Sequence, residues 1–403
     1  MAIELTARTG PGNHLVATAE ALADDIAARA AAHDRDGSYP FESIEAVRRT
    51  GYFTAPVPHE LGGLGVSSVH DVIVASGRLA RGDASVAIGV NMHLGVVLNL
   101  VRRWQMARAA DNTRREQAFA ASLRRLVDDA VVMAGATSEP GQDLSRPRTT
   151  AVRSNGGWRV DGHKIFCTMA PAATVLVTSV RFRADDGGER YGWVEIPAGA
   201  PGVHINDDWD ALGMRASGSH SVTFDAVPLR AGAVRGGFPT GDTVPFVERN
   251  LPLGLFHASA SLGIAEAAFA NAAQPDRIGD DARGRMLAAE SLIDLSAARA
   301  ALARAAALID EHFAANPEAP GTDEELMALF ADGQAAKTFV SDAATRVVDR
   351  ALALSGGAGY LNGSPLARAY RDVRACAFMH PLGANRVYDF LGDVALGRTP
   401  VVR

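Results

Sequence analysis

The chain has 403 residues, of which 47% are hydrophobic and 21% are charged, and its formal net charge is −6 at pH 7. Its length exceeds the ~250–300 residues at which single hydrophobic cores usually divide, so two or three domains are expected. The composition is that of a globular protein, and the acidic balance excludes a basic chain that binds nucleic acid or an anionic membrane through overall charge.

The cysteines and the N-terminal residues allow a prediction of where the protein is located. Cys167 and Cys376 are the only cysteines and are far apart, so we expect no disulfide framework and a reducing, cytoplasmic location. No basic and apolar leader begins the chain, and no secretory signal is expected. Residues 84–101 approach the length of a membrane span but include His93 and two asparagines, which favours a buried helix. No metal-binding, P-loop or dinucleotide pattern occurs in a suitable context, so no metal is expected.

The first third, residues 1–130, is predicted to be a helical domain. An alanine-rich pattern with charged residues at helical spacing indicates a helix over 14–33. Tyr39-Pro40-Phe41-Glu42 opens a second helix, because proline is tolerated in a first turn, and Gly51 ends it. Further helical patterns extend over about 67–81, 84–103 and 112–127.

Residues 131–240 are predicted to form a β-domain. Short β-prone runs follow one another at 131–137, 148–153, 158–161, 174–182, 191–196, 202–205 and 219–224. Asn155-Gly156-Gly157 between two alternating runs is typical of a hairpin turn. Short strands without intervening helices predict an antiparallel barrel or sandwich.

The last part, residues 241–403, is predicted to be a helical bundle. Alanine-rich amphipathic patterns extend over 263–271, 284–312, 323–354 and 365–396. The glycine-rich run from Ser355 to Tyr360 ends one helix and lets the backbone approach another group closely. The fold class predicted from this order is α+β, with helices, then a small β-domain, then a helical bundle.

Five segments with specific residues occur in the order that the acyl-CoA dehydrogenase superfamily has them, and the chain resembles that superfamily over nearly its whole length. They are Pro58 with Leu61-Gly62-Gly63-Leu64-Gly65, Thr137-Ser138-Glu139-Pro140-Gly141-Gln142-Asp143, Gly162-His163-Lys164-Ile165-Phe166-Cys167-Thr168, Leu212-Gly213-Met214-Arg215-Ala216-Ser217-Gly218-Ser219, and Arg371-Asp372 through His380-Pro381. The resemblance implies an N-terminal helical domain, a middle antiparallel β-barrel and a C-terminal four-helix bundle. It also implies a homotetramer, for which the alanine-rich helices 284–312 and 323–354 suit close packing.

The resemblance further implies a flavin site. Phe166 would pack against the isoalloxazine ring, and Thr168 would offer its hydroxyl to N5. Thr137 and Ser138 would bond the pyrimidine edge. Taken alone, Phe166 has the alternative of an ordinary barrel core residue, and Thr168 that of a strand-end threonine.

The residue in the position of the catalytic base departs from the dehydrogenases. Their glutamate, eight residues after the aspartate of the Arg-Asp pair, removes the α-proton of a thioester, and here the same count from Asp372 reaches His380. Some members supply the glutamate from an earlier helix, where this chain has Leu253, and the nearest acid, Glu248, reads as an exposed acid at a helix start. A neutral imidazole suits proton exchange with a phenol, an amine or a flavin–oxygen adduct.

The cofactor clamp of the dehydrogenases is missing as well. Their Arg-x-x-Phe-Gly element holds the FAD diphosphate and adenosine across a dimer interface. The corresponding residues 272–281 lack the Phe-Gly step and contain Pro275, which interrupts a helix. Gly356 and Gly357 remain as predicted cofactor-binding residues, and a loosely held, exchangeable flavin is expected.

These departures resemble the two-component flavin monooxygenases of the superfamily, which include phenol hydroxylases, dibenzothiophene monooxygenases and amino-sugar N-oxygenases. Such enzymes take reduced flavin, FMNH2 or FADH2, from a separate reductase and react it with O2 to a C4a-(hydro)peroxyflavin that oxygenates a small substrate. The resemblance implies that His380 manages a proton in this reaction, with His93 as its partner. The alternatives are a helix-start histidine for His380 and a hydrogen-bonded core histidine for His93.

Two other functions stay open at this point. The first is an FAD-dependent acyl-CoA or acyl-carrier-protein dehydrogenase with an atypical base, which would hold FAD tightly. The second is a flavin-fold protein retained as a structural or regulatory subunit, which would bind no flavin.

Overall fold

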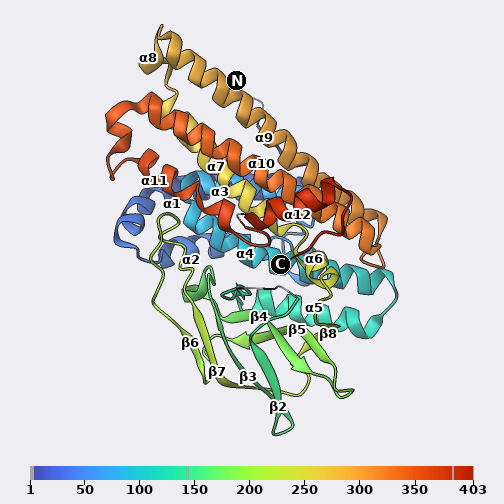
Figure 1. Cartoon of the computed structure of the whole chain (residues 1–403). Coiled ribbons are helices and arrows are strands. Elements are labelled where there is room, and N and C mark those ends of the chain that lie inside the picture. Colours follow the sequence, from blue (N-terminus) through green and yellow to red (C-terminus); the bar gives the residue numbers. More distant parts are fainter. Residues whose placement is uncertain (1–3, 142, 144, 384, 403) are drawn as a thin grey trace.

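The computed structural model describes residues 4–141, 143, 145–383 and 385–402. Gln142, part of one family-like segment, lies outside the described residues. The molecule has a helical layer and a sheet packed against one side of it (Figure 1). Helices from the first and last thirds of the chain lie side by side in the helical layer, and α3 (Val69–Gly82) packs on α7 (Leu253–Ala272).

The first third forms helices, as predicted. They are α1 (Gly10–Asp36), α2 (Phe41–Arg49), α3, α4 (Ala84–Ala109) and α5 (Thr113–Asp128), with 3-10 turns over Tyr52–Thr54 and His59–Leu61. Residues with short polar side chains cap α3 and α4: Ser68 accepts from the Asp71 N–H at 3.2 Å, and Asp83 accepts from the Ser85 N–H at 2.8 Å. Such caps satisfy donors that a first helical turn leaves unpaired.

The described residues of the middle part form one eight-stranded sheet. Its strands are β1 (Met133–Ala136), β2 (Thr150–Ser154), β3 (Gly157–Lys164), β4 (Val175–Arg183), β5 (Glu189–Pro197), β6 (Val203–Ile205), β7 (Val222–Leu229) and β8 (Arg235–Pro239). The β2–β3 hairpin turns at Asn155 and Gly156, whose φ angles of 49° and 75° are the positive values that a tight hairpin turn needs.

Strand pairing corrects the predicted antiparallel barrel. The pairing order is β6-β7-β3-β2-β4-β5-β8, and β4 pairs in parallel with both β1 and β2. The pairing path through the described strands has free ends at β6 and β8, so the sheet is not closed by hydrogen bonds. The sequence pattern identifies strands but not the direction of their neighbours, because side chains alternate in the same way in both arrangements.

The last part contains α6 (Val244–Asn250), α7, α8 (Pro275–Ile278), α9 (Ala282–Ala315), α10 (Asp323–Ser355), α11 (Pro365–Asp372) and α12 (Asn385–Ala395). The single helix predicted over 365–396 is wrong. α11 ends at Asp372, a 3-10 turn follows over Ala375–Phe378, and His380 lies in a loop before α12. Pro381 explains the break, because proline lacks an N–H and disfavours helical geometry in the residue before it.

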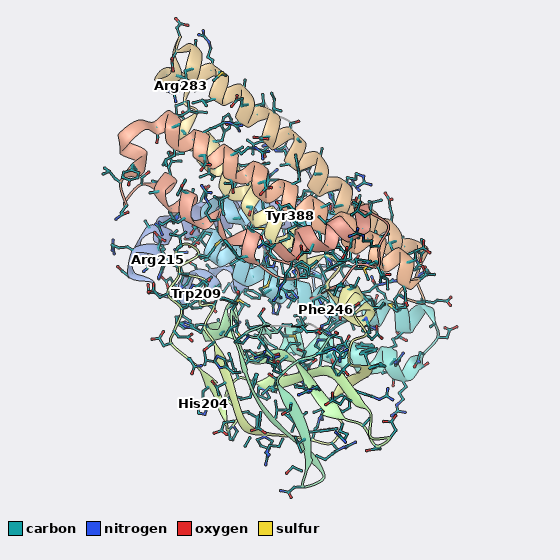
Figure 2. All side chains as sticks on the ribbon, in the orientation of Figure 1. His204, Trp209, Arg215, Phe246, Arg283 and Tyr388 are labelled. Atoms are coloured by element: carbon teal, nitrogen blue, oxygen red, sulfur yellow. The ribbon has the colours of Figure 1, made fainter. Side chains whose placement is uncertain are left out.

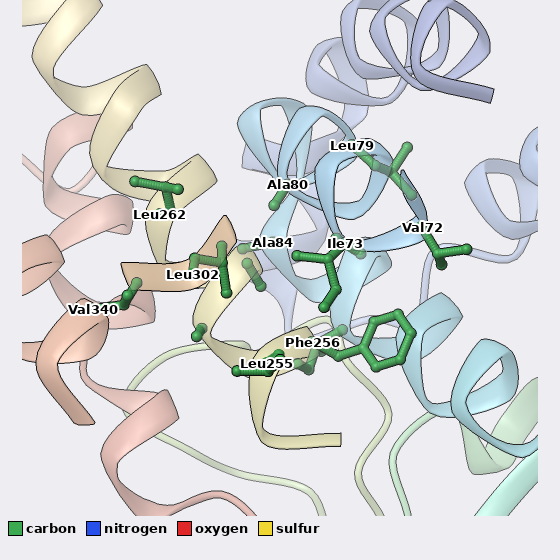
Figure 3. Close-up of a cluster of buried hydrophobic side chains, with 14 of the residues drawn as sticks. Val72, Ile73, Leu79, Ala80, Ala84, Leu255, Phe256, Leu262, Leu302 and Val340 are labelled. Atoms are coloured by element: carbon green, nitrogen blue, oxygen red, sulfur yellow. The ribbon is translucent and has the colours of Figure 1, made fainter. Parts of the chain in front are cut away.

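One hydrophobic core joins the two helical parts, while the sheet has its own. Figure 3 shows Ile73 of α3 and Phe256 of α7 in this core, with Leu302 of α9 and Val340 of α10 in the same cluster. α4 and residues Val244–Ala272 are long and apolar enough to cross a membrane, but 78% of each apolar window is buried inside the structure. Burial of this extent is typical of a core helix, as predicted for residues 84–101.

Candidate active site

Two adjoining cavities lie between α4, the sheet and the loop that carries His380. The large cavity has a volume of about 300 Å³ and the small cavity about 90 Å³. Met92, Ser138, Phe166 and His380 line both, so they form the boundary between the two cavities. The large cavity extends to Thr168, Trp209, Ser217, Ser219 and His257, and the small cavity to Asn99, Thr137, Trp193, Arg249 and Leu253.

The backbone around Phe166 presents its ring to the cavities. Phe166 has a φ of 56°, a left-handed conformation that costs a non-glycine residue ~1–3 kcal/mol, and it is 61% exposed. The Cys167 N–H donates to the His220 carbonyl at 3.0 Å and fixes the chain directly after it. Trp209, in the band where sheet and helices meet (Figure 2), approaches the Phe166 ring edge-on with 6.2 Å between ring centres. An aromatic face held open in this way suits a planar ligand and is unlike a barrel core residue.

A buried ion pair fixes the two family-like segments beside the cavities. Glu139 accepts from Lys164 Nζ at 2.7 Å, and also from the Thr149 N–H and hydroxyl at 2.8 and 2.7 Å. Burial raises the pKa of Glu139, but Lys164 and these donors outweigh it and hold the pKa below its ordinary value. The pair ties the chain after β1 to β3, which sets Ser138 and Phe166 on the cavity wall.

Three hydroxyl groups follow one another along the large cavity. Thr168 Oγ1 lies 3.0 Å from Ser219 Oγ, which lies 2.7 Å from Ser217 Oγ. Hydroxyls both donate and accept, so they suit the N5 and carbonyl edges of an isoalloxazine whose face lies against Phe166. The wall of the large cavity therefore fits a flavin ring.

The Arg371-Asp372 pair anchors the loop that carries His380. Arg371 donates to the two carboxylate oxygens of Asp34, at the end of α1, at 2.8 and 2.5 Å. Asp372 accepts from the Met214 N–H at 2.6 Å, and burial raises the pKa of its carboxyl to about 7. These bonds tie the loop to α1 and to the turn at Met214, so the count of eight residues from Asp372 brings His380 to the cavity boundary.

The His380 imidazole makes no hydrogen bond within the described part of the chain and faces both cavities. Phe246 packs on it edge-to-face, with 5.2 Å between ring centres. Lys337 Nζ donates to the carbonyls of Met379 and Leu382 at 2.5 and 2.8 Å, which fixes the backbone on both sides of the histidine. Desolvation, followed by the charge of Lys337, lowers the pKa of His380 to about 3, so the ring is neutral at pH 7.

A second histidine, His257 of α7, lies on the wall of the large cavity. It is 3% exposed, and neither ring nitrogen has a hydrogen-bond partner among the described residues. Desolvation, and then the charge of Lys337, lowers its pKa well below 6.5. Buried polar atoms are normally paired, and both nitrogens are covered by protein atoms and are not open to the large cavity.

The structure does not bring the other predicted site residues to the cavities. The His93 Nε2–H donates to the Phe53 carbonyl at 3.0 Å, and its Nδ1 accepts from the Met133 N–H at 2.9 Å. Both nitrogens are therefore used in structural bonds, as in the alternative of a hydrogen-bonded core histidine. Gly356 and Gly357 lie in an exposed 3-10 turn after α10 and line neither cavity.

Several residues of the cavity walls carry no signal in the sequence. Trp193, Arg249 and Asn99 come from β5, α6 and α4 and belong to no recognisable motif. Lys337 carried a usable signal, because it stands on the inward face of a long helix, where an unpaired lysine is uncommon. The sequence places it 43 residues before His380, so only the fold brings the two together.

Comparison with known proteins agrees with this geometry. The sequence matches the N-terminal domain of acyl-CoA dehydrogenases over residues 14–106, the middle domain over 133–227 and the C-terminal domain over 255–381. It is 35% identical to L-evernosamine nitrososynthase of a Micromonospora species, over 92% of this chain and 87% of the relative. It is 33% identical to the amino sugar nitrososynthase DnmZ of Streptomyces peucetius, over 97% of this chain and 95% of the relative.

Solved structures give the same result. KijD3 in complex with FMN and dTDP-3-amino-2,3,6-trideoxy-4-keto-3-methyl-D-glucose superposes with a TM-score of 0.88 at 32% identity, over 99% of this chain and 97% of KijD3. FMN-bound TdsC of Paenibacillus shares the fold, with a TM-score of 0.82 at 23% identity over 97% of this chain and 99% of TdsC. The resemblance predicted from the motifs is confirmed. The chain belongs to the acyl-CoA dehydrogenase family, in its flavin-dependent monooxygenase branch.

Proposed function

We propose that this chain is a flavin-dependent N-oxygenase that acts on the amino group of a sugar and takes reduced FMN from a separate reductase. His380 carries the proposal, because a neutral imidazole with free nitrogens stands where the dehydrogenases have a carboxylate. The nitrososynthase relatives support an amino sugar as substrate, and the FMN complex of KijD3 supports FMN.

The first oxidation of the amine consumes one O2. One oxygen atom is transferred to the amine nitrogen to give a hydroxylamine, and the other leaves as water. Reduced flavin supplies the two electrons and activates O2. A second cycle on the hydroxylamine gives the nitroso compound by the same balance, with loss of a further water.

The residues of this chain have separate parts in the reaction. Phe166 and the Thr168 hydroxyl would hold the flavin ring in the large cavity, and the amine would enter from the small cavity. The nitrogen becomes positively charged as it takes up oxygen, and its proton is then far more acidic than that of a free ammonium. His380 accepts this proton at its free ring nitrogen, which a base of low pKa can do only at that stage. Met92 and Leu253 add apolar wall that excludes water.

We propose two further features of the family for this chain. A reductase delivers the flavin transiently, and four copies of the chain assemble into a homotetramer through α9, α10 and α12. Exposed apolar side chains on these helices support the assembly: Met286, Leu292, Ile293, Phe339, Tyr388 and Val394. The dehydrogenase alternative is disfavoured, because His380 and Leu253 occupy the two positions that supply a carboxylate base in the dehydrogenases.

The test supplies photoreduced FMN and O2 to the purified protein with dTDP-3-amino-2,3,6-trideoxy-4-keto-3-methyl-D-glucose, the sugar of the KijD3 complex. We expect a hydroxylamine or nitroso product by mass spectrometry. The His380→Ala variant should still bind FMN but release hydrogen peroxide in place of most product. Unchanged product yield in that variant removes His380 from the mechanism. Tightly bound FAD that an acyl-CoA bleaches without oxygen supports a dehydrogenase instead.

A further inference from the structure

Arg249 lies in the wall of the small cavity and has no ion-pair partner in the part of the chain that the structure describes. Its guanidinium carbon lies 5.0 Å from the centre of the Trp193 ring, which lines the same cavity. Stacking uses the face of the planar group and leaves its N–H edges available. No hydrogen bond or ion pair of Arg249 with another side chain occurs within residues 4–141, 143, 145–383 and 385–402.

The neighbouring acids are already engaged by other arginines. Glu248 accepts from Arg103 at 2.9 Å, and Glu195 accepts from Arg235 at 3.0 Å. Three arginines therefore face two glutamates, and one positive charge stays uncompensated. Desolvation, followed by repulsion from Arg103, lowers the pKa of Arg249 to about 10, so it is charged at pH 7. Arg249 is half-buried, and an anionic ligand would offset the cost of keeping its charge unpaired there.

A neutral polar group stands beside this charge. Asn99 of α4 lines the small cavity, and its amide makes no hydrogen bond to another part of the described chain. An amide can donate to an anion, and a guanidinium can donate twice in one plane, which is the geometry that a phosphate accepts best. Asn250, Thr137 and Ser138 are further polar residues of the wall, and Val96 and Leu253 are among its apolar ones.

We propose that Arg249, assisted by Asn99, is the group that holds a phosphate when the amino sugar is carried on a nucleotide, as it is in the KijD3 complex. The inference rests on the proposed function, because it names the handle by which the same site holds its amine. The assignment of Arg249 also orients the substrate in the cavity. The diphosphate lies at Trp193 and Arg249, and the amino group points toward His380 at the cavity boundary.

In the test, the full-length protein is titrated separately with dTDP, thymidine and inorganic pyrophosphate, and binding is measured by calorimetry. We expect dTDP to bind and thymidine to bind at least about tenfold more weakly. Added salt should lower the affinity for dTDP. Arg249→Met, which keeps side-chain length, should lose about tenfold or more in dTDP affinity, and Arg249→Lys should lose less. Arg283→Met is the matched control, since it removes the same charge at the outer tip of α9, away from Trp209 and Phe246 (Figure 2).

Unchanged dTDP affinity in Arg249→Met overturns the assignment, as does equal loss in Arg283→Met. Preference for an unphosphorylated amino sugar in the oxygenation assay, with Arg249→Met fully active, overturns the subsite while the N-oxygenase function stands. Binding of dTDP that depends on Arg249, without any oxygenation by reduced FMN, overturns the proposed function and supports the subsite alone. Circular dichroism and FMN affinity of each variant distinguish loss of the subsite from loss of the fold.

Discussion

At the scale of single residues, Lys337 fixes the backbone beside His380 and, after desolvation, is the second cause of its lowered pKa. It donates to two carbonyls beside the histidine and has no carboxylate partner among the described residues. Lys337→Met should leave these carbonyls without their donor, at a cost of ~1–3 kcal/mol in the free energy of unfolding, and should raise the pKa of His380 toward its ordinary 6.5. The measurement is the pH dependence of product formation, in which the acid limb should move to higher pH.

The control for Lys337 is a variant that removes another cation from the same helix. Arg346→Met removes an exposed cation from the same helix, which pairs with Asp294, and should leave the acid limb in place. If Lys337→Met lowers activity equally at every pH, the lysine acts through packing alone and not on the proton affinity of His380.

His93 should make stability depend on pH. Desolvation lowers its pKa from 6.5 to about 4 in the folded chain, so the folded state keeps the ring neutral. As pH falls from 6.5 toward 4, His93 takes up a proton in the unfolded chain but not in the folded chain. The free energy of unfolding therefore decreases by up to ~1.4 kcal/mol per pH unit. His93→Gln, whose amide can make both backbone bonds, should lose this part of the slope in urea denaturation between pH 7.5 and 5. Equal slopes for the two proteins would contradict this account.

At the scale of secondary-structure elements, α3 and α7 pack closely because glycine stands at their crossing. A Cβ added to Gly263 would lie 2.3 Å from the carbonyl oxygen of Gly77 and 2.9 Å from the Ala80 Cβ. Gly263→Ala should therefore push the helices apart and lower the free energy of unfolding by ~1–3 kcal/mol. Gly392→Ala, in α12 with no atom within 4 Å of the added Cβ, is the control and should raise it by up to ~1 kcal/mol. Thermal denaturation of both variants checks the prediction, and equal shifts would oppose it.

Some secondary-structure elements could be predicted from the sequence, and others could not. Helical periodicity located α3, α4, α9 and α10 closely, because each buries one face over many turns. The loop at His380 was merged into a helix, since alanine-rich residues on both sides of Pro381 hide a break that tertiary bonds of Asp372 stabilise. The parallel pairing of β4 was missed because no local pattern records which strand lies beside which.

At the scale of the whole molecule, the site is assembled from parts that the sequence keeps far apart. Motifs predicted the positions of Ser138, Phe166, Thr168 and His380, because each stands in a short segment with a fixed count of residues. Arg249 is a single arginine in a short helix, and its meaning depends on Trp193 and on two glutamates occupied by other arginines. Such a charge imbalance exists only in three dimensions, so no reading of the sequence alone would have found it.

The homotetramer is the prediction that belongs to the molecule as a whole. Met286 and Ile293 of α9 are 54% and 67% exposed, and α9 lies on the outer edge of the helical layer, on the side away from the sheet (Figure 1). Apolar side chains gathered on such a face favour burial against a second copy. Light scattering should give four chains of 42.2 kDa for the natural protein and a smaller assembly for the double variant Met286→Glu, Ile293→Glu. Val152→Glu, at a 49% exposed apolar position on β2, is the control that should stay tetrameric, and a monomeric mass for the natural protein would refute the assembly.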